Sequence, residues 1–173
     1  LAGSDLFEAG EHSERGGLLM TDWKLPWSAS CQCGGVKMRV TAPPMIAMAC
    51  HCRSCQRLTS GAYSLTLMIP DGGFEVVSGE PVIGGMHREE LKHSFCPHCH
   101  NWLFTRPQGR PFVNFRPATL EDSSWVQPYV ESGAQDKLPG AVSGAKHSYS
   151  EFPPPSDYQM LMEGYAREGA KPR

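Results

Sequence analysis

The segment that decides the fold lies at residues 50–55 and reads Cys50-His51-Cys52-Arg53-Ser54-Cys55. The other four cysteines also come in close pairs, Cys31 with Cys33 and Cys96 with Cys99. Seven thiols are an odd number, so they cannot all pair as disulfides within one chain, and disulfide partners rarely cluster in this way. Clustered thiolates are typical of metal sites in a reducing compartment, which predicts zinc binding and a cytoplasmic protein.

Four of the cysteines have the arrangement of a closed, structural zinc site, in which four ligands surround the ion as a tetrahedron. Cys96 and Cys99 form one half of this site. Cys31 and Cys33 qualify as the other half, because alternate residues of an extended segment face the same way. An ion shared by the two pairs would join the first strand to a hairpin about 60 residues further along the chain, and would stabilise the fold.

The remaining cysteines, Cys50, Cys52 and Cys55, supply three ligands within six residues. A catalytic zinc ion usually has three protein ligands and one open position, whereas a structural ion has four. Three thiolates make the ion a weak Lewis acid for water but a good partner for an exchangeable thiolate. We therefore predict a second zinc ion, which is catalytic, and thiol chemistry in preference to hydrolysis.

Histidines offer an alternative, as a fourth protein ligand for the second ion. The candidates are His51, His93, His98 and His100. His51 lies between two ligands and would have to point away from an ion held by its neighbours, and His98 and His100 meet the same difficulty beside Cys99. Each is better interpreted as a residue around the sites or at the surface. A single cluster of all seven thiolates is a further alternative, but it would need bridging sulfurs.

Short apolar runs separated by glycine and proline turns predict an all-β core. Val36–Thr41 alternates apolar with polar residues, the pattern of a strand with one buried face. Residues 52–60 are expected to form a knuckle or short helical turn closed by Gly61. Further strands are predicted at Met45–Ala49, Ala62–Ile69, Phe74–Val77, Pro81–Ile83, Leu91–Phe95, Trp102–Thr105 and Phe112–Phe115.

The C-terminal third of the chain differs, because residues 122–155 are rich in proline and glycine and show little periodicity. A helix is predicted after the proline run 153–155, with Ser156 and Gln159 as a capping box and Gly169 as its stop. The apolar stripe expected to pack on the β core comprises Tyr158, Leu161, Met162 and Tyr165.

The expected organisation is a single domain. Residues 1–19 are polar, lack an initiator methionine and have no apolar region like that of a secretory signal, so we expect a disordered extension or a cloning remnant, with Met20 as the native start. Residues 20–155 are expected to form one zinc-binding β domain, and residues 156–173 a C-terminal helix and tail.

The composition of the 173-residue chain argues against several classes of partner. The formal net charge is −2 and the charged residues are mixed, which gives no basic face for phosphates, so no nucleic acid is expected. The longest apolar stretches fall far short of the roughly 20 residues that a membrane span requires, so no membrane is expected either.

Three segments together resemble the motifs of the glutathione-dependent formaldehyde-activating family, which also includes centromere protein V. They are Cys31-Gln32-Cys33-Gly34, residues 50–55, and Phe95-Cys96-Pro97-His98-Cys99. Further similarity runs through Gln56–Ser64 and Phe115–Pro128, and the whole resemblance covers about Lys24–Pro154. It implies small antiparallel sheets in a β-tent of the Mss4-like type with zinc knuckles, which agrees with the short strands predicted above.

The resemblance also implies a division of the cysteines that agrees with the ligand counting. It assigns the closed zinc to Cys31, Cys33, Cys96 and Cys99, and the open zinc to Cys50, Cys52 and Cys55. One departure is His100, where the family commonly has glycine directly after the last cysteine. Glycine tolerates a positive φ angle there, whereas histidine does so at some energetic cost.

The function implied by the resemblance is a zinc-dependent carbon–sulfur lyase or synthase, which reversibly joins a thiol such as glutathione to formaldehyde or a related small aldehyde. In this scheme the open zinc binds the thiol as a thiolate beside the carbonyl carbon. We expect His51 or a bound water to deliver the proton to the developing alkoxide. Arg53, Arg57 and Lys92 are candidates to attract glutathione carboxylates, although charges at such positions are more often simply solvated.

Two other functions remain as alternatives. The first is a non-catalytic zinc-binding scaffold or interaction module, in which the second ion is structural as well. The second is a redox protein that uses Cys52 and Cys55 as a dithiol. The redox interpretation is weaker, because the βαβ context of thioredoxin-like motifs is missing and the neighbouring Cys50 favours metal binding.

Overall fold

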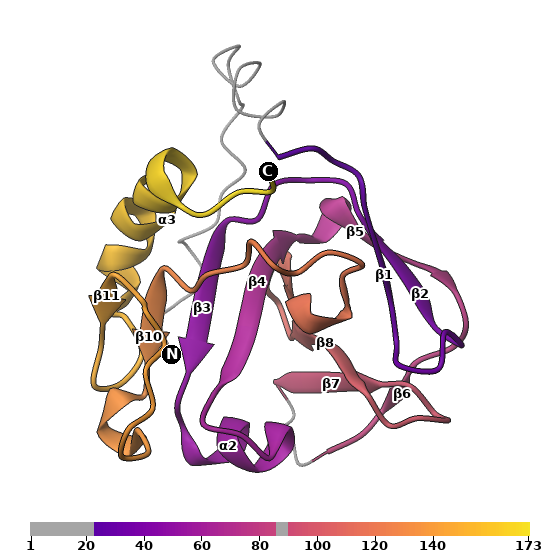
Figure 1. Cartoon of the computed structure of the whole chain (residues 1–173), viewed down its shortest axis with the longest axis horizontal. Helices are drawn as coiled ribbons and strands as arrows, with labels where there is room; N and C mark the ends of the chain where they lie inside the picture. Colours follow the sequence, from indigo (N-terminus) through magenta and orange to yellow (C-terminus); the bar gives the residue numbers. More distant parts are fainter. Residues whose placement is uncertain (1–22, 86–89) are drawn as a thin grey trace.

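The computed structural model describes residues 23–85 and 90–173, whose strands form two sheets (Figure 1). The smaller sheet comprises β1 (Trp27–Ser30), β2 (Lys37–Val40) and β5 (Phe74–Ser78), antiparallel in the order β1-β2-β5. The larger sheet comprises β3 (Ile46–Cys50), β4 (Ser64–Pro70), β6 (Val82–Ile83), β7 (Leu91–Phe95), β8 (Trp102–Pro107), β9 (Phe112–Phe115), β10 (Val130–Ser132) and β11 (His147–Ser148). Its strand order is β11-β10-β3-β4-β9-β8-β7-β6. The predicted extension of residues 1–19 lies outside the described residues.

Strands β3 and β4 lie in the middle of the larger sheet and lead to the cysteine-rich segment. They pair in antiparallel register from Ile46 opposite Met68 to Cys50 opposite Ser64. Residues 46–49 are all buried, because β3 lies between β4 and β10 and also contacts helix α3 (Tyr158–Glu168). Figure 1 shows that β3 ends beside the short helix α2 (Arg53–Thr59), so the strand delivers Cys50 to the start of that helix.

The predicted mainly β fold, with small antiparallel sheets and a C-terminal helix, is confirmed. Strand β2 alternates exposed and buried residues as predicted, and places Met38 and Val40 in the core. The sequence interpretation missed β1, which pairs with β2 from Trp27 opposite Val40. The larger sheet is also mixed rather than purely antiparallel, since β10 is parallel to both of its neighbours.

The segment predicted to lack periodicity, residues 122–155, contributes the two strands β10 and β11. Val130 lies opposite Met48 and Ser132 opposite Cys50, so β10 runs alongside the end of β3 that carries the cysteine. The pairing joins segments about 80 residues apart, and a three-residue strand shows no period of its own, so no local pattern signals it.

Helix α2 occupies the predicted knuckle, with Cys52 as its N-cap residue. It ends at Ser60, which adopts a left-handed conformation with φ of 51° and donates its amide to the Gln56 carbonyl. The Gly61 amide also donates to the Gln56 carbonyl, at 3.3 Å, so Gly61 takes part in closing the turn as predicted.

Helix α3 begins after a 3-10 turn, η4 (Pro155–Asp157), and the predicted capping box is wrong. Ser156 Oγ hydrogen-bonds to Asp157 Oδ1 at 3.1 Å, and Gln159 reaches a glutamate one turn further on. The proline run fixes the backbone of this turn, so the helix starts without a side-chain cap.

The apolar stripe of α3 is confirmed as part of the core. Leu161 and Tyr165 are buried, and Tyr158 and Met162 pack against the core. Gly169 is the C-cap as predicted, with an ordinary negative φ.

None of the helices in the described part of the chain combines the length and the apolar character that crossing a membrane requires.

Candidate metal centres

The four-cysteine group joins the two sheets. Cys31 and Cys33 lie in the turn between β1 and β2, and Cys96 and Cys99 lie in the turn between β7 and β8. All four sulfurs lie within 4.8 Å of one another, with 3.5 Å between Cys31 and Cys33 and 3.7 Å between Cys33 and Cys96. The predicted set of four is thus brought together from the two ends of a long stretch of chain.

The donor set of this group fits a zinc ion. Four thiolates around zinc, each at about 2.3 Å, place their sulfurs about 3.8 Å apart, which agrees with the measured separations. The Val36 amide donates to the Cys31 sulfur at 3.2 Å, and a hydrogen bond from the Asn101 amide is the main factor that lowers the pKa of Cys99, to about 6. These amides stabilise thiolates, the form in which cysteine binds metal.

The residue after the last cysteine has the conformation that the comparison with the family motif predicted. His100 has a positive φ of 57°, in the left-handed region where glycine is normally favoured. Its amide donates to the Cys96 carbonyl at 3.0 Å, which closes the turn around the cysteine pair. The histidine side chain is exposed, so the position tolerates it at the surface.

The three-cysteine group lies between β3 and α2. Cys50 is the last residue of β3, Cys52 is the N-cap of α2, and Cys55 lies in the first turn of the helix. Their sulfurs also lie within 4.8 Å of one another. Gln56 fixes the segment, since its Nε2 donates to the His51 carbonyl at 2.5 Å and to the Asp136 carbonyl at 2.8 Å.

The three thiols of this group share protons unequally. Hydrogen bonds with Cys50 and then Cys55 lower the pKa of Cys52. The hydrogen bond with Cys52 raises the pKa of Cys50, and hydrogen bonds with Cys50 and then Cys52 raise the pKa of Cys55. Ser64, opposite Cys50 in the β3–β4 register, hydrogen-bonds to Cys55. One thiol ionises readily, and a soft cation would displace the remaining protons as it binds.

Neither group gains a histidine among the residues that the structure describes. The His51 ring is fully buried, and its Nε2 lies 3.1 Å from Glu131 Oε2. His93 Nδ1 hydrogen-bonds to Thr105 Oγ1 at 2.8 Å, and the side chains of His98 and His100 are exposed. The alternative in which one of these histidines completes the second site therefore finds no support in the geometry.

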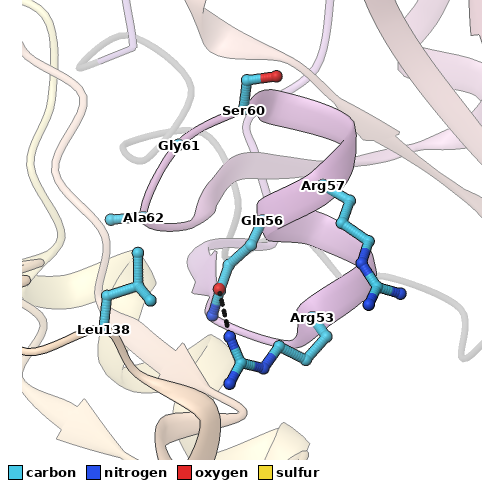
Figure 2. A pocket seen from close by; sticks show the side chains of 7 residues that line it. All are labelled: Arg53, Gln56, Arg57, Ser60, Gly61, Ala62 and Leu138. Carbon is cyan, nitrogen blue, oxygen red and sulfur yellow. Dashed lines mark hydrogen bonds between the residues drawn. The ribbon is translucent and has the colours of Figure 1, made fainter.

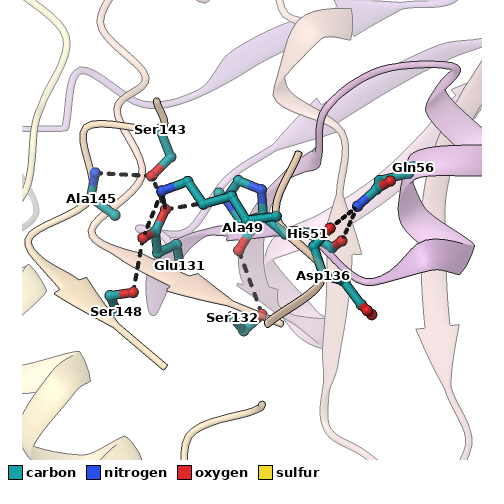
Figure 3. A network of polar contacts seen from close by, with 10 residues as sticks. Ala49, His51, Gln56, Glu131, Ser132, Asp136, Ser143, Ala145 and Ser148 are labelled. Atoms are coloured by element: carbon teal, nitrogen blue, oxygen red, sulfur yellow. Dashed lines mark hydrogen bonds and ion pairs between the residues drawn. The ribbon is translucent and has the colours of Figure 1, made fainter. Parts of the chain in front are cut away.

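A buried carboxylate that the sequence interpretation missed holds the other side of the knuckle (Figure 3). Glu131, on β10, is 7% exposed and accepts hydrogen bonds from Lys137 Nζ, Ser143 Oγ and Ser148 Oγ, in addition to facing His51. Burial alone would raise the pKa of Glu131, but these hydrogen bonds outweigh it and lower the pKa to about 2. The network fixes His51 and, through it, the backbone between Cys50 and Cys52.

A buried cation lies near the three thiols. Arg116 donates from Nη1 to Thr66 Oγ1 at 2.6 Å and to the Leu65 carbonyl at 3.2 Å, and its guanidinium lies over the Trp102 ring at 3.8 Å. Burial lowers the pKa of Arg116 to about 10, while the thiols of the three-cysteine group act in the opposite direction. Its positive charge therefore favours the ionised form of those thiols.

A cavity of about 430 Å³ opens beside α2 (Figure 2). Its lining residues are Arg53, Gln56, Arg57, Ser60, Gly61, Ala62 and Leu138. Two of the three predicted carboxylate-binding residues, Arg53 and Arg57, are thus brought together, whereas Lys92 lies on β7 and is not part of the lining. The cavity and the three-cysteine group share one short helix.

Comparison with known proteins gives one family and one example of a similar structure. The family described as glutathione-dependent formaldehyde-activating enzyme matches residues 26–135, a range that contains all seven cysteines. No curated protein matches the chain significantly. The crystal structure of a Rhodobacter sphaeroides protein has a TM-score of 0.47 and 17% sequence identity, and the similarity covers 70% of this chain and 98% of that chain.

Proposed function

Because the chain belongs to the glutathione-dependent formaldehyde-activating enzyme family, we propose that it reversibly adds a thiol, such as glutathione, to formaldehyde or a related small aldehyde. The reaction is that of a carbon–sulfur lyase, or of a synthase in the joining direction. Cys50, Cys52 and Cys55 form the reactive centre in this proposal, and the four-cysteine group is structural.

The observation that carries the proposal is the difference in ligand number between the two groups. Cys31, Cys33, Cys96 and Cys99 could supply all four ligands of a tetrahedral zinc ion, whereas Cys50, Cys52 and Cys55 could supply three and would leave one position for an outside ligand. Three protein ligands and an exchangeable fourth are the usual composition of a catalytic zinc site. A fourth sulfur from a substrate thiol would complete the soft donor set.

When bound to the three thiolates, zinc supplies a positive charge beside which the substrate thiol is held in its thiolate form. The Arg116 guanidinium adds a buried positive charge nearby and offsets part of the negative charge of the cysteines. In the joining direction the substrate sulfur forms a bond to the carbonyl carbon, the π pair moves to the oxygen, and a proton neutralises the alkoxide.

The source of that proton is part of the proposal. The His51 ring, predicted as a catalytic group, is fully buried with Nε2 against Glu131, and its Nδ1 has no hydrogen-bond partner among the residues that the structure describes. We assign His51 and Glu131 the positioning of the cysteine segment, and assign proton delivery to water that reaches the centre with the substrate.

The proposal is tested by exchange NMR of glutathione with formaldehyde at equilibrium, with the zinc-loaded protein. We expect the wild type to accelerate the exchange and Cys52→Ala to abolish the acceleration, because the variant loses one of three ligands and therefore its second metal ion. Metal analysis should give two ions for the wild type and one for the variant.

The matched control is Ser54→Ala, in the same segment and exposed, which should retain both ions and full exchange. Full activity of folded Cys52→Ala would contradict the assignment of the centre. Two bound ions with no acceleration for any thiol would instead favour the non-catalytic zinc module.

A further inference from the structure

Arg116 is a buried cation without a carboxylate partner. It follows β9 directly and is 8% exposed, and no ion pair in the described part of the chain includes it. Its Nη1 donates to Thr66 Oγ1 at 2.6 Å and to the Leu65 carbonyl at 3.2 Å, whereas its Nε has no hydrogen-bond partner among the described residues. A buried charge is costly unless it is paired, so a compensating negative charge is expected close to it.

The sheet register places this cation beside the three-cysteine group. In the pairing of β3 with β4, Cys50 lies opposite Ser64, and Thr66 is two residues further along β4. Side chains alternate between the two faces of a sheet, so these three side chains share one face. Diagonal neighbours across an antiparallel pair lie about 7–8 Å apart. The hydroxyl group that Arg116 binds therefore belongs to a close neighbour of Cys50.

The guanidinium is fixed in this position. Its central carbon lies 3.8 Å from the centroid of the Trp102 ring, and the hydrogen bonds of Nη1 attach it to β4. The backbone that carries it is fixed as well, because the Arg116 amide donates to the Leu103 carbonyl at 2.9 Å. The positive charge is thus enclosed by protein rather than by water, and acts strongly on charges near it.

Cys55 and Cys50 are the groups whose negative charge acts on this cation. Burial lowers the pKa of Arg116 to about 10, and the two thiols oppose that effect. Three thiolates around a divalent ion carry one net negative charge, which a single guanidinium balances. An anion at the fourth position would add a second negative charge, whereas a neutral ligand would add none. The charge of Arg116 therefore assists the binding of an anion and has little effect on a neutral ligand.

We infer that Arg116 is a specificity-determining residue of the reactive centre, where its buried charge balances the three-thiolate metal complex and favours an anion over a neutral ligand at the fourth position. The inference rests on the proposed function, in which Cys50, Cys52 and Cys55 hold the reactive metal ion. It assigns the fourth position to an anionic donor and leaves a neutral carbonyl oxygen outside it.

The test uses the cobalt-substituted protein, because the d–d absorption bands of cobalt(II) change when its fourth ligand changes. Azide and imidazole are the probes: both bind through nitrogen, and at about pH 8 the first is an anion and the second is mostly neutral. We expect the dissociation constant of azide to rise about tenfold in Arg116→Gln and less than about threefold in Arg116→Lys, which keeps the charge. The dissociation constant of imidazole should change less than about twofold in both variants.

The matched control is Arg39→Gln, which removes an equal charge from the smaller sheet and should bind azide as the wild type does. If Arg116→Gln does not fold, Arg116→Lys still decides the question, since it loses the planar contacts of the guanidinium but keeps the charge.

Three results would overturn the inference: an azide affinity about tenfold weaker in Arg116→Lys, equal losses for azide and imidazole in Arg116→Gln, or no response of the wild type to azide. The titration does not depend on catalysis. Absence of thiol exchange with formaldehyde, together with the expected azide affinities, would count against the proposed function alone.

Discussion

At Glu131, one side chain determines how the residues around it are held. Its two oxygens face a lysine, two serines and the His51 ring, and the residue is almost fully buried. A buried carboxylate is stable only when it is paired and hydrogen-bonded in this way. Replacing the carboxylate with an amide would remove the negative charge that pairs with Lys137 and would replace one of the two acceptor oxygens with a donor.

We expect Glu131→Gln to lower the free energy of unfolding at pH 7 by about 2–3 kcal/mol, since it leaves buried donors and a cation unpaired. The pKa of Glu131 is about 2 in the folded protein and near 4.5 when unfolded, so its stabilisation is present above pH 4.5 and is lost as the pH falls through 2. Urea unfolding from pH 7 to pH 2 should show the wild type and the variant converging over that range.

The matched control for this prediction is Glu80→Gln, an exposed carboxyl, which should shift stability little at any pH. Loss of metal in acid affects the wild type and both variants alike and cancels in the difference between them. A difference between the wild type and Glu131→Gln that stayed constant down to pH 2 would contradict the assigned pKa.

The sequence alone identifies the cysteines of the candidate metal centres but does not identify Glu131 or Arg116. The cysteines are visible because a metal site needs several ligands of one type at short spacing, and the two groups agree with the predicted division. Glu131 and Arg116 are ordinary charged residues in the sequence, and only burial beside His51 and the thiols distinguishes them. His51 lies 80 residues from Glu131, and Thr66 lies 50 residues from Arg116, so no local spacing could have identified these contacts.

Between elements, the junction of β10 with α2 depends on one glycine. Gly133 follows β10 with a positive φ of 65°, and a Cβ atom placed there would lie 2.9 Å from the Cys52 backbone nitrogen. The chain passes this close because β10 must pair with β3 while the following turn contacts Gln56. Only glycine allows both the backbone angle and the approach.

We expect Gly133→Ala to destabilise the protein by about 2–3 kcal/mol and to weaken metal retention by the three-cysteine group, because the new methyl displaces Cys52. Gly140→Ala is the matched control: it has a similar positive φ, 79°, but open space around its Cβ position, so it should cost only about 1 kcal/mol. Chemical denaturation and competition with a chromogenic chelator measure the two effects. Identical behaviour of the two variants would contradict the contact.

Whether an element could be predicted depends on whether its pattern is local. The central strands and the buried stripe of α3 follow from apolar runs and helical spacing. The capping box was wrong, because the proline run sets the start of α3 by its own backbone angles. Strand β10 is a strand because it pairs with β3, so the sequence of its three residues alone does not predict it.

At the scale of the molecule, the two cysteine groups hold different extents of chain. The four-cysteine group connects the β1–β2 turn of the smaller sheet to the β7–β8 turn of the larger sheet. The three-cysteine group lies within one turn of chain between β3 and α2. Loss of a metal ion from the first group would therefore remove a link between the two sheets, which also share the hydrophobic core, whereas loss from the second group would affect one segment.

We expect Cys99→Ser to lower the free energy of unfolding by about 3–5 kcal/mol, because it releases a long-range closure, and Cys52→Ser to lower it by less than about 1.5 kcal/mol. A chelator should likewise remove one ion quickly with little change in circular dichroism, and the second ion only together with unfolding. Equal losses of stability in the two serine variants would contradict the separation of roles.

The spacing of the two groups also orders events during synthesis. Cys50, Cys52 and Cys55 emerge from the ribosome together, so a nascent chain has three ligands for an ion before β7, β8 or β10 exists. The other group must wait until Cys99 has been made, more than half of the way along the chain. If each group holds one ion, the ion that joins the two sheets can be captured only after the other site is complete, so we expect scarcity of the metal to appear as a failure to complete folding.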